Sequence, residues 1–406
     1  MLTRPALSKP RTIIRAAILS LAAALLSVSC DGAKDPIAPA PTVSGKVTSS
    51  VTGTGVAGAE VHIGAVIVTT DADGRFQVTD FTAGEVMVRC SAQGFMDFET
   101  TIILGTGDTT YNIGLSRIEV FEFGDFALYV PAGADVARSI IVAFGGPDTR
   151  GFATAKPMGA PVPSVEVSLQ ALGQDMRSLA STHRLAVLGT SRTAMPNKPE
   201  SDQIIREAVA TAAVLSGRAE LPKIPVLLYG MSGGAPQASG FAVRNSASVA
   251  GLFLKVPASV SSVTTGPALE VPAYMVLAET DAFVNNATLT AAFEGNRKAR
   301  ALWALATEPG VIHHSLTPAQ RQLTINWMRT ILSLRLPADP SSGRLRTLEE
   351  NSGWFGNRAT GEVNSAEDLA WMGSVAASAF DSWFPSEATA REWKTFVAPR
   401  PASIVQ

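Results

Sequence analysis

Between residues 120 and 334, short and mostly apolar segments alternate with segments of helical periodicity. Each apolar segment has the length and composition of a strand that is buried on both faces of a sheet. These segments cover residues 139–144, 185–189, 226–229, 252–256, 273–277 and 301–306. Because strands that alternate with helices form a mainly parallel sheet with helices on both faces, the sequence predicts an α/β domain here.

Two of the helical segments carry boundary signals. Ser201 is a candidate N-cap for a helix with an apolar stripe that stops at Gly217. Thr317 followed by Pro318 predicts the start of a last helix that runs to about residue 334.

The segment Gly230-Met231-Ser232-Gly233-Gly234 directly follows the apolar segment that ends at Tyr229. A helical pattern follows it, with Pro236 in the first turn, where proline is tolerated. A sharp turn between strand and helix exposes a serine hydroxyl at the carboxyl end of the sheet. The turn also directs the positive end of the helix dipole at developing negative charge. Ser232 is therefore the candidate nucleophile.

With this strand, serine turn and helix, residues 117–338 resemble the α/β-hydrolase superfamily. The general layout is most similar to secreted polyhydroxybutyrate-depolymerase-like and feruloyl-esterase-like members. The resemblance implies a serine, an acid and a histidine in that chain order, acting by acyl transfer. It implies no metal and no organic cofactor.

The histidine must be found among four. His62 lies in a different domain, and His183 lies on the N-terminal side of the nucleophile. His313 and His314 follow the last apolar segment, where the order of the superfamily places the base. The catalytic histidine of the superfamily usually comes three residues after a glycine, which favours His313, with His314 as the alternative base or a substrate contact.

The acid and the oxyanion hole are assigned by position. The superfamily places its acid on the loop after the segment 273–277, which favours Asp281, with Glu279 as the alternative. An oxyanion hole needs backbone N–H donors. We expect one from Gly233, directly after the nucleophile, and one from the loop after residue 144, with Gly146 as first choice and Gly145 as second.

The N-terminus has the pattern of an export signal. Four basic side chains and no acid precede an apolar run over residues 16–28, which is short for a membrane span. The run ends at Cys30 and resembles a bacterial lipoprotein signal, although Ser27 stands where leucine is usual. We therefore expect residues 1–30 to be a signal peptide. We also expect membrane attachment in the cell envelope through a lipidated Cys30, with simple secretion as the alternative.

A proline-containing linker over residues 31–41 leads to a segment, residues 42–116, with short alternating strands between glycine and aspartate turns. This pattern predicts a small all-β sandwich. Four short segments within it, at residues 43–47, 56–61, 70–76 and 92–95, resemble the carboxypeptidase-regulatory-like, transthyretin-type domain. Such domains of bacterial envelope proteins resemble spacers or interaction modules. The turn 71–74 has the start of a calcium loop but lacks its later ligands, so it predicts a β-turn.

The tail, residues 339–406, holds four of the six tryptophans, so we expect it to pack on the hydrolase domain or to cap its site. The formal net charge of −2 gives no support to nucleic-acid binding, which needs clustered cations. Two cysteines are too few for a disulfide framework or a cysteine zinc site.

These observations together predict an exported serine hydrolase that acts on a small or polymeric carboxylic ester. A serine peptidase with the same triad and a non-catalytic envelope binding protein on a hydrolase scaffold are the alternatives.

Overall fold

The computed structural model describes residues 41–79, 81–133, 136–160, 162–193, 195–339, 344–371 and 381–398. The expected signal segment, Cys30 and all but the last residue of the linker lie outside these ranges. No helix within them is long and apolar enough to cross a membrane.

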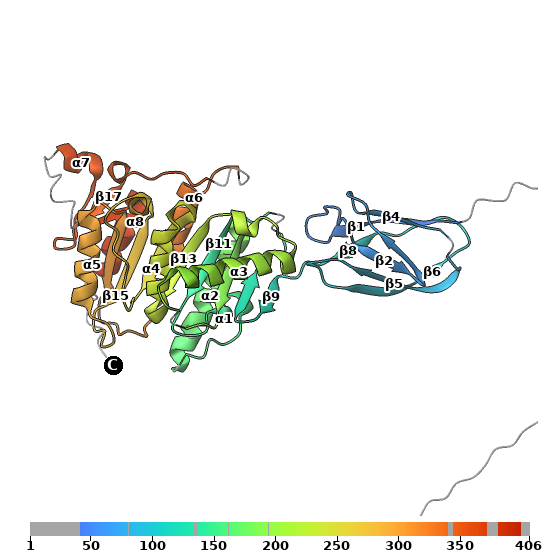
Figure 1. Cartoon of the computed structure of the whole chain (residues 1–406), viewed down its shortest axis with the longest axis horizontal. Helices are drawn as coiled ribbons and strands as arrows, with labels where there is room; N and C mark the ends of the chain where they lie inside the picture. The colour runs from blue at the N-terminus through green and yellow to red at the C-terminus, as the bar shows by residue number, and fades with distance from the viewer. Residues whose placement is uncertain are drawn as a thin grey trace, which may run out of the picture. The chain divides into compact units, whose positions relative to one another are not determined.

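Two four-stranded sheets make up the N-terminal β domain (Figure 1). One sheet has the order β4-β1-β7, with β8 also paired to β1, and the other has the order β3-β2-β5-β6. The strands are β1 Val43–Ser49, β2 Glu60–Ile63, β3 Val66–Thr69, β4 Arg75–Val78, β5 Gly84–Ser91, β6 Phe98–Leu104, β7 Thr109–Thr110 and β8 Ile113–Leu115. Alternate side chains such as Phe76 and Val78 are buried, which gives one core between the sheets. The predicted small β-sandwich is confirmed.

The turn 71–74 needs no ion to hold it. The Asp71 carboxylate accepts hydrogen bonds from the backbone amides of Asp73 and Arg75, and Gly74 has a φ of +80°.

One eight-stranded sheet forms the centre of the second domain, in the order β16-β15-β14-β13-β11-β12-β10-β9. Its strands are β9 Val120–Phe123, β10 Phe126–Tyr129, β11 Ser139–Phe144, β12 Leu185–Thr190, β13 Val226–Met231, β14 Val249–Lys255, β15 Ala273–Ala278 and β16 Trp303–Glu308. The last six are parallel, whereas β9 and β10 form an antiparallel hairpin at one edge.

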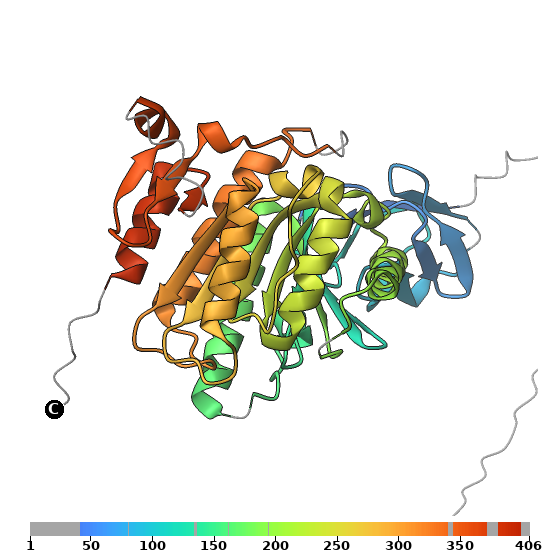
Figure 2. The same cartoon turned by 60° about the vertical axis from the view of Figure 1, so that its left-hand side comes forward.

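Helices cover both faces of this sheet (Figures 1 and 2). One face packs against α3 Pro199–Ser216, α4 Ala235–Arg244 and α5 Asn286–Lys298, and the other against α1 Arg150–Thr154, α2 Pro163–His183 and α6 Pro318–Arg335. Neighbouring residues of β11 show why: Ile140 faces the first helical layer and Ile141 the second. Since both faces are covered, each strand is apolar along its length, and the predicted fold class is confirmed.

Two predicted boundaries differ from the structure. Helix α3 begins at Pro199, and Ser201 is a buried residue of its first turn instead of the N-cap. The fixed φ of proline suits the first helical position, so the helix begins earlier than the serine suggests. Likewise β16 begins at Trp303 instead of residue 301, since Arg300 adopts a left-handed φ of +71° just before it. Thr317 does cap α6, accepting a hydrogen bond from the Gln320 amide.

The tail packs against the free edge of the sheet. It forms η6 Glu350–Ser352, β17 Trp354–Gly356, β18 Val363–Ser365, α7 Ala366–Trp371, β19 Ser382–Phe384 and α8 Glu387–Val397. Ser382 Oγ bonds both the N–H and the C=O of Leu305 on β16, at 2.9 and 3.0 Å. Trp393 Nε1 donates to the same carbonyl at 2.8 Å. The described part of the tail thus satisfies the backbone amide and carbonyl of Leu305 at the edge of β16.

Candidate active site

Ser232 occupies a strained turn between β13 and α4. Its φ is +50°, in the left-handed region that a residue with a side chain seldom adopts. The two flanking glycines explain how the chain makes this turn. A Cβ on Gly230 would lie 2.8 Å from Ala238 Cβ, and one on Gly234 would lie 2.4 Å from the backbone nitrogen of Gly145. Strand, turn and helix can approach this closely only because both positions lack a side chain.

A continuous chain of hydrogen bonds runs from the serine to a carboxylate. Ser232 Oγ lies 2.9 Å from His313 Nε2, and His313 Nδ1 lies 2.7 Å from Asp281 Oδ2. The Asp281 side chain is fully buried and that of His313 is 5% exposed. These distances suit proton transfer from the hydroxyl to the imidazole, with the carboxylate fixing the tautomer.

Asp281 is held in its charged form. Burial by itself would raise the pKa of this carboxyl. Hydrogen bonds from the backbone amides of Phe283 and Val284, at 2.8 and 3.1 Å, and from His313 outweigh that effect and lower the pKa below its ordinary value. A charged Asp281 can therefore stabilise an imidazolium at its neighbour.

Burial is the main cause that lowers the pKa of His313 below its ordinary value of 6.5. Asp281 opposes this effect, and the positive charge of Lys255 adds to it. The imidazole is consequently neutral near pH 7, as a general base must be.

Lys255, at the end of β14, is a feature that the sequence reading missed. Its side chain is buried, with the residue 2% exposed, and Nζ donates a hydrogen bond to the backbone carbonyl of His313 at 3.0 Å. Burial lowers its pKa from 10.5 to about 8, although Glu308 and Asp281 oppose that effect. A lone lysine in the otherwise apolar segment 252–256 was the signal that could have revealed it.

Gly146 lies against the serine. A Cβ on this glycine would be 3.8 Å from Ser232 Cβ and 4.0 Å from Oγ. Thr149 fixes the loop that carries it, because its buried hydroxyl donates to the carbonyls of Ala143 and Thr190 at 2.8 and 3.0 Å. Gly145 faces Thr149 instead of the serine. Of the two expected loop donors, Gly146 is thus the one beside Ser232, and Gly233 follows the serine directly.

The remaining alternatives lie close by but in different roles. His314 packs edge-on against His313, with ring centroids 5.0 Å apart, and lines the cavity described below. Glu279 is exposed and accepts a hydrogen bond from the Gly310 amide at 2.7 Å. The structure therefore brings Ser232, His313 and Asp281 together, and neither alternative takes part in their hydrogen bonds.

All of these residues follow the carboxyl ends of parallel strands. Gly146 follows β11, Ser232 follows β13, Asp281 follows β15 and His313 follows β16. The order of the strands reverses around β11, whose neighbours are β12 on one side and β13 on the other. In open α/β sheets such a reversal leaves a crevice at the carboxyl edge, where ligands bind.

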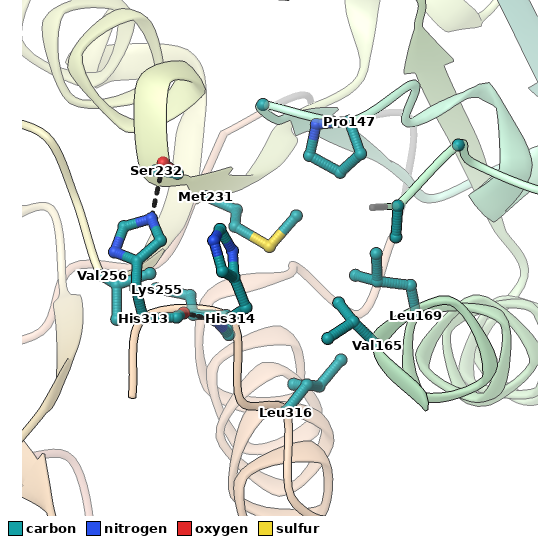
Figure 3. Close-up of a pocket in the computed structure, with 13 residues that line it drawn as sticks. Pro147, Val165, Leu169, Met231, Ser232, Lys255, Val256, His313, His314 and Leu316 are labelled. Carbon is teal, nitrogen blue, oxygen red and sulfur yellow. Dashed lines mark hydrogen bonds between the residues drawn. The ribbon is translucent and has the colours of Figure 1, made fainter. Parts of the chain in front are cut away.

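A cavity of about 190 Å³, the active-site cavity, opens at Ser232 (Figure 3). Its apolar wall comes from α2, from the loop before α6 and from the carboxyl ends of β13 and β14, and the His314 ring points into it. The main apolar side chains of the wall are Val165, Leu169, Met231, Val256 and Leu316. Helix α2 was not predicted from the sequence, so neither was this wall. The described residues of the tail contribute nothing to the lining, so they do not cap the site as one expectation held.

Within the described ranges, no group of three or more histidine, cysteine, aspartate or glutamate side chains could hold a metal ion. The arrangement of Ser232, His313 and Asp281 is that of a nucleophile, its base and an orienting acid.

Strand order, serine turn and helical layers are those of the α/β-hydrolase fold. The N-terminal β domain matches the carboxypeptidase regulatory-like domain family over residues 42–116. A search of curated proteins gave no match.

Several solved structures have a distantly similar fold. A thermostable esterase is 11% identical with a TM-score of 0.37, covering 71% of this chain and 98% of its own. Esterase PE8 is 16% identical with a TM-score of 0.36, covering 53% of this chain and 100% of its own. The fluorophosphonate-binding serine hydrolase F of Staphylococcus aureus is 12% identical with a TM-score of 0.34, covering 50% of this chain and 91% of its own. At these values the neighbours carry no information about the reaction of this chain.

Proposed function

We propose that this chain is a serine hydrolase that cleaves carboxylic esters through an acyl-enzyme on Ser232. The observation that carries the proposal is the unbroken hydrogen-bond chain from Ser232 through His313 to buried Asp281. The strained backbone of Ser232 supports it, because strain of this kind persists mainly where function requires it.

The reaction has two steps. Ser232 Oγ attacks the ester carbonyl while His313 Nε2 takes its proton, and the carbonyl oxygen becomes an oxyanion facing the amides of Gly233 and Gly146. His313 then gives the proton to the leaving alkoxide, the C–O bond breaks, and an alcohol departs. A water that His313 deprotonates attacks the acyl-enzyme, which releases the acid and restores Ser232. Each oxyanion donor contributes roughly 3–4 kcal/mol in related sites.

Labelling with a fluorophosphonate probe tests the nucleophile. We expect the wild type to be labelled and the Ser232→Ala variant to remain unlabelled. A matched control is Ser239→Ala, because Ser239 lies on α4 and bonds Ser261 and Pro236 away from the relay. A folded wild type that does not react, or labelling that survives Ser232→Ala, would contradict the proposal.

Steady-state assays with p-nitrophenyl acetate and with aminoacyl nitroanilides separate an esterase from a peptidase. We expect ester turnover to exceed anilide turnover. The reverse order would assign the same residues to a peptidase, and a labelled protein that turns over neither substrate would favour a binding protein.

For the N-terminal segment, we propose export to the bacterial cell envelope and lipidation at Cys30. The basic start, the apolar run and the cysteine at its end support this. Growth with an alkyne-tagged fatty acid in a bacterial host should label the wild type and leave Cys30→Ala unlabelled. Cys90→Ala is the control, since Cys90 is buried in the β domain. Equal labelling of both variants would refute lipidation at Cys30.

A further inference from the structure

A second hollow adjoins the active-site cavity. It has a volume of about 320 Å³ and lies between the loop after His313 and the start of α2. Val165, His314 and Leu316 line both hollows and form the wall between them. The reactive serine and histidine line only the first hollow, so the second extends the site outward from the place of reaction.

The mouth of this second hollow is unusually apolar. Ile312 is 57% exposed, Val162 is 43% exposed, and both line it. Phe283 is 70% exposed, and its ring lies 4.9 Å from that of His314. Large apolar side chains gathered at one exposed place mark a surface that binds something apolar. The other lining groups are hydroxyls of serine and threonine, and no carboxylate, lysine or arginine is among the residues that line it.

We propose that the substrate is a neutral, two-part apolar ester, with its acyl group in the active-site cavity and its alcohol group in the second hollow. This inference rests on the proposed function. It assigns the sides by chemistry, because His313 must protonate the leaving oxygen and both chain neighbours of His313, Ile312 and His314, line the second hollow. The active-site cavity is the smaller of the two hollows, so its volume sets the size of the acyl group. A cavity of about 150 Å³ accommodates benzene, so 190 Å³ suits an acyl group of similar or slightly larger size.

Two acetate esters with alcohols of similar basicity test the alcohol side: ethyl acetate and 2-(2-naphthyl)ethyl acetate. Ile312→Ser removes apolar surface from the mouth of the second hollow. We expect kcat/KM for the naphthylethyl ester to fall roughly tenfold, mainly through KM, as for lost apolar contacts in other sites. For ethyl acetate we expect a change of less than about twofold, since that alcohol is too small to reach Ile312.

Val167→Ser is the matched control. Val167 is a similarly exposed apolar residue (66%) on α2, the helix that faces Ile312 across the second hollow, and it lines neither hollow. We expect it to change kcat/KM for neither ester.

For the acyl side, Leu169→Ala enlarges the active-site cavity. This variant should raise the ratio of kcat/KM for ethyl hexanoate to kcat/KM for ethyl acetate.

The outcomes separate the inference from the proposed function. In an active enzyme, the inference is overturned if Ile312→Ser lowers kcat/KM equally for both acetate esters or for neither. It is also overturned if Ile312→Ser changes the preference for acyl chain length and leaves the preference for the alcohol unchanged. A wild type that cleaves none of these esters and takes no fluorophosphonate label overturns the proposed function and the inference with it.

Discussion

Lys255 is a buried cation beside His313 and Asp281, and replacing it with methionine should change stability in a pH-dependent way. The methionine side chain has a similar length and no charge. Because burial holds the pKa of Lys255 at about 8 instead of 10.5, the folded state gives up its proton more readily than the unfolded chain does. Below pH 8 the folded protein must keep this side chain charged at a cost in free energy.

The size of that cost follows from the two pKa values. They differ by about 2.5, and at about 1.4 kcal/mol per pKa unit the cost at neutral pH is roughly 3 kcal/mol. Against it stands the hydrogen bond from Nζ to the His313 carbonyl, with a net contribution of about 1.5–3 kcal/mol for a charged donor. At pH 7 we therefore expect the stability of Lys255→Met to lie between that of the wild type and a value about 1.5 kcal/mol higher.

The pH dependence has a definite sign. Between pH 8 and 10.5 the unfolded chain binds more protons at this residue than the folded protein, so the wild type gains stability as the pH rises. Lys255→Met lacks this gain, because methionine does not titrate. Relative to the wild type, the variant should lose about 3 kcal/mol between pH 7 and 10.5, because titrating groups away from Lys255 contribute equally to both and the lowered pKa of His313 lies below this range.

Urea unfolding followed by tryptophan fluorescence at pH 7, 8, 9 and 10 measures this difference. All six tryptophans lie after residue 300, so the signal reports the hydrolase part of the chain and not the β domain. A stability difference that stays constant within about 0.5 kcal/mol over this range would show that Lys255 does not carry a buried charge, and would refute the reasoning.

Three further substitutions have definite expected outcomes. Asp281→Asn should lower kcat on p-nitrophenyl acetate by about 10⁴, with Glu279→Gln as a control that changes it less than about threefold; a fall below tenfold for Asp281→Asn would argue against its role. Gly234→Ala should lower kcat by at least about a hundredfold, because its Cβ would lie 2.4 Å from the Gly145 nitrogen and displace the loop that faces the oxyanion. An unchanged kcat would contradict this close approach of Gly234 to the loop. Arg297→Ala should reduce the free energy of unfolding by about 3–5 kcal/mol, because this fully buried guanidinium pairs with a carboxylate of the tail; urea unfolding checks it, and a loss below 1 kcal/mol would not fit.

The fold and the position of Ser232 were predictable because their signals are local. A strand buried on both faces is apolar along its length, and a strand-to-helix turn needs glycine at fixed places. Asp281 and His313 were expected only from their order along the chain. The choice between His313 and His314 was open, because adjacent loop residues point in different directions that sequence spacing does not fix.

The walls of the cavity were not predictable. Helix α2 supplies Val165 and Leu169. Its buried residues have regular helical spacing, so the helix itself could have been predicted, but the spacing does not show which of them line the cavity. Lys255 stands out as a lone charge in the apolar segment 252–256, but the sequence does not show which groups it contacts. Which hollow a side chain lines depends on packing between elements that are far apart in the sequence, such as α2 and the loop before α6.

The contacts of Ser382 and Trp393 with β16 also bear on how this protein remains a separate molecule. An open edge of a parallel sheet offers unpaired backbone groups to any other extended chain, and growth of the sheet from molecule to molecule leads to aggregation. Here two side chains, instead of another strand, occupy the polar groups of Leu305, so at this residue the edge offers no unpaired backbone groups to another chain. The described residues of the tail thus protect the edge of the sheet at this point, and a recombinant version cut back to the end of α6 should lose solubility before Ser232 loses its reactivity towards a fluorophosphonate.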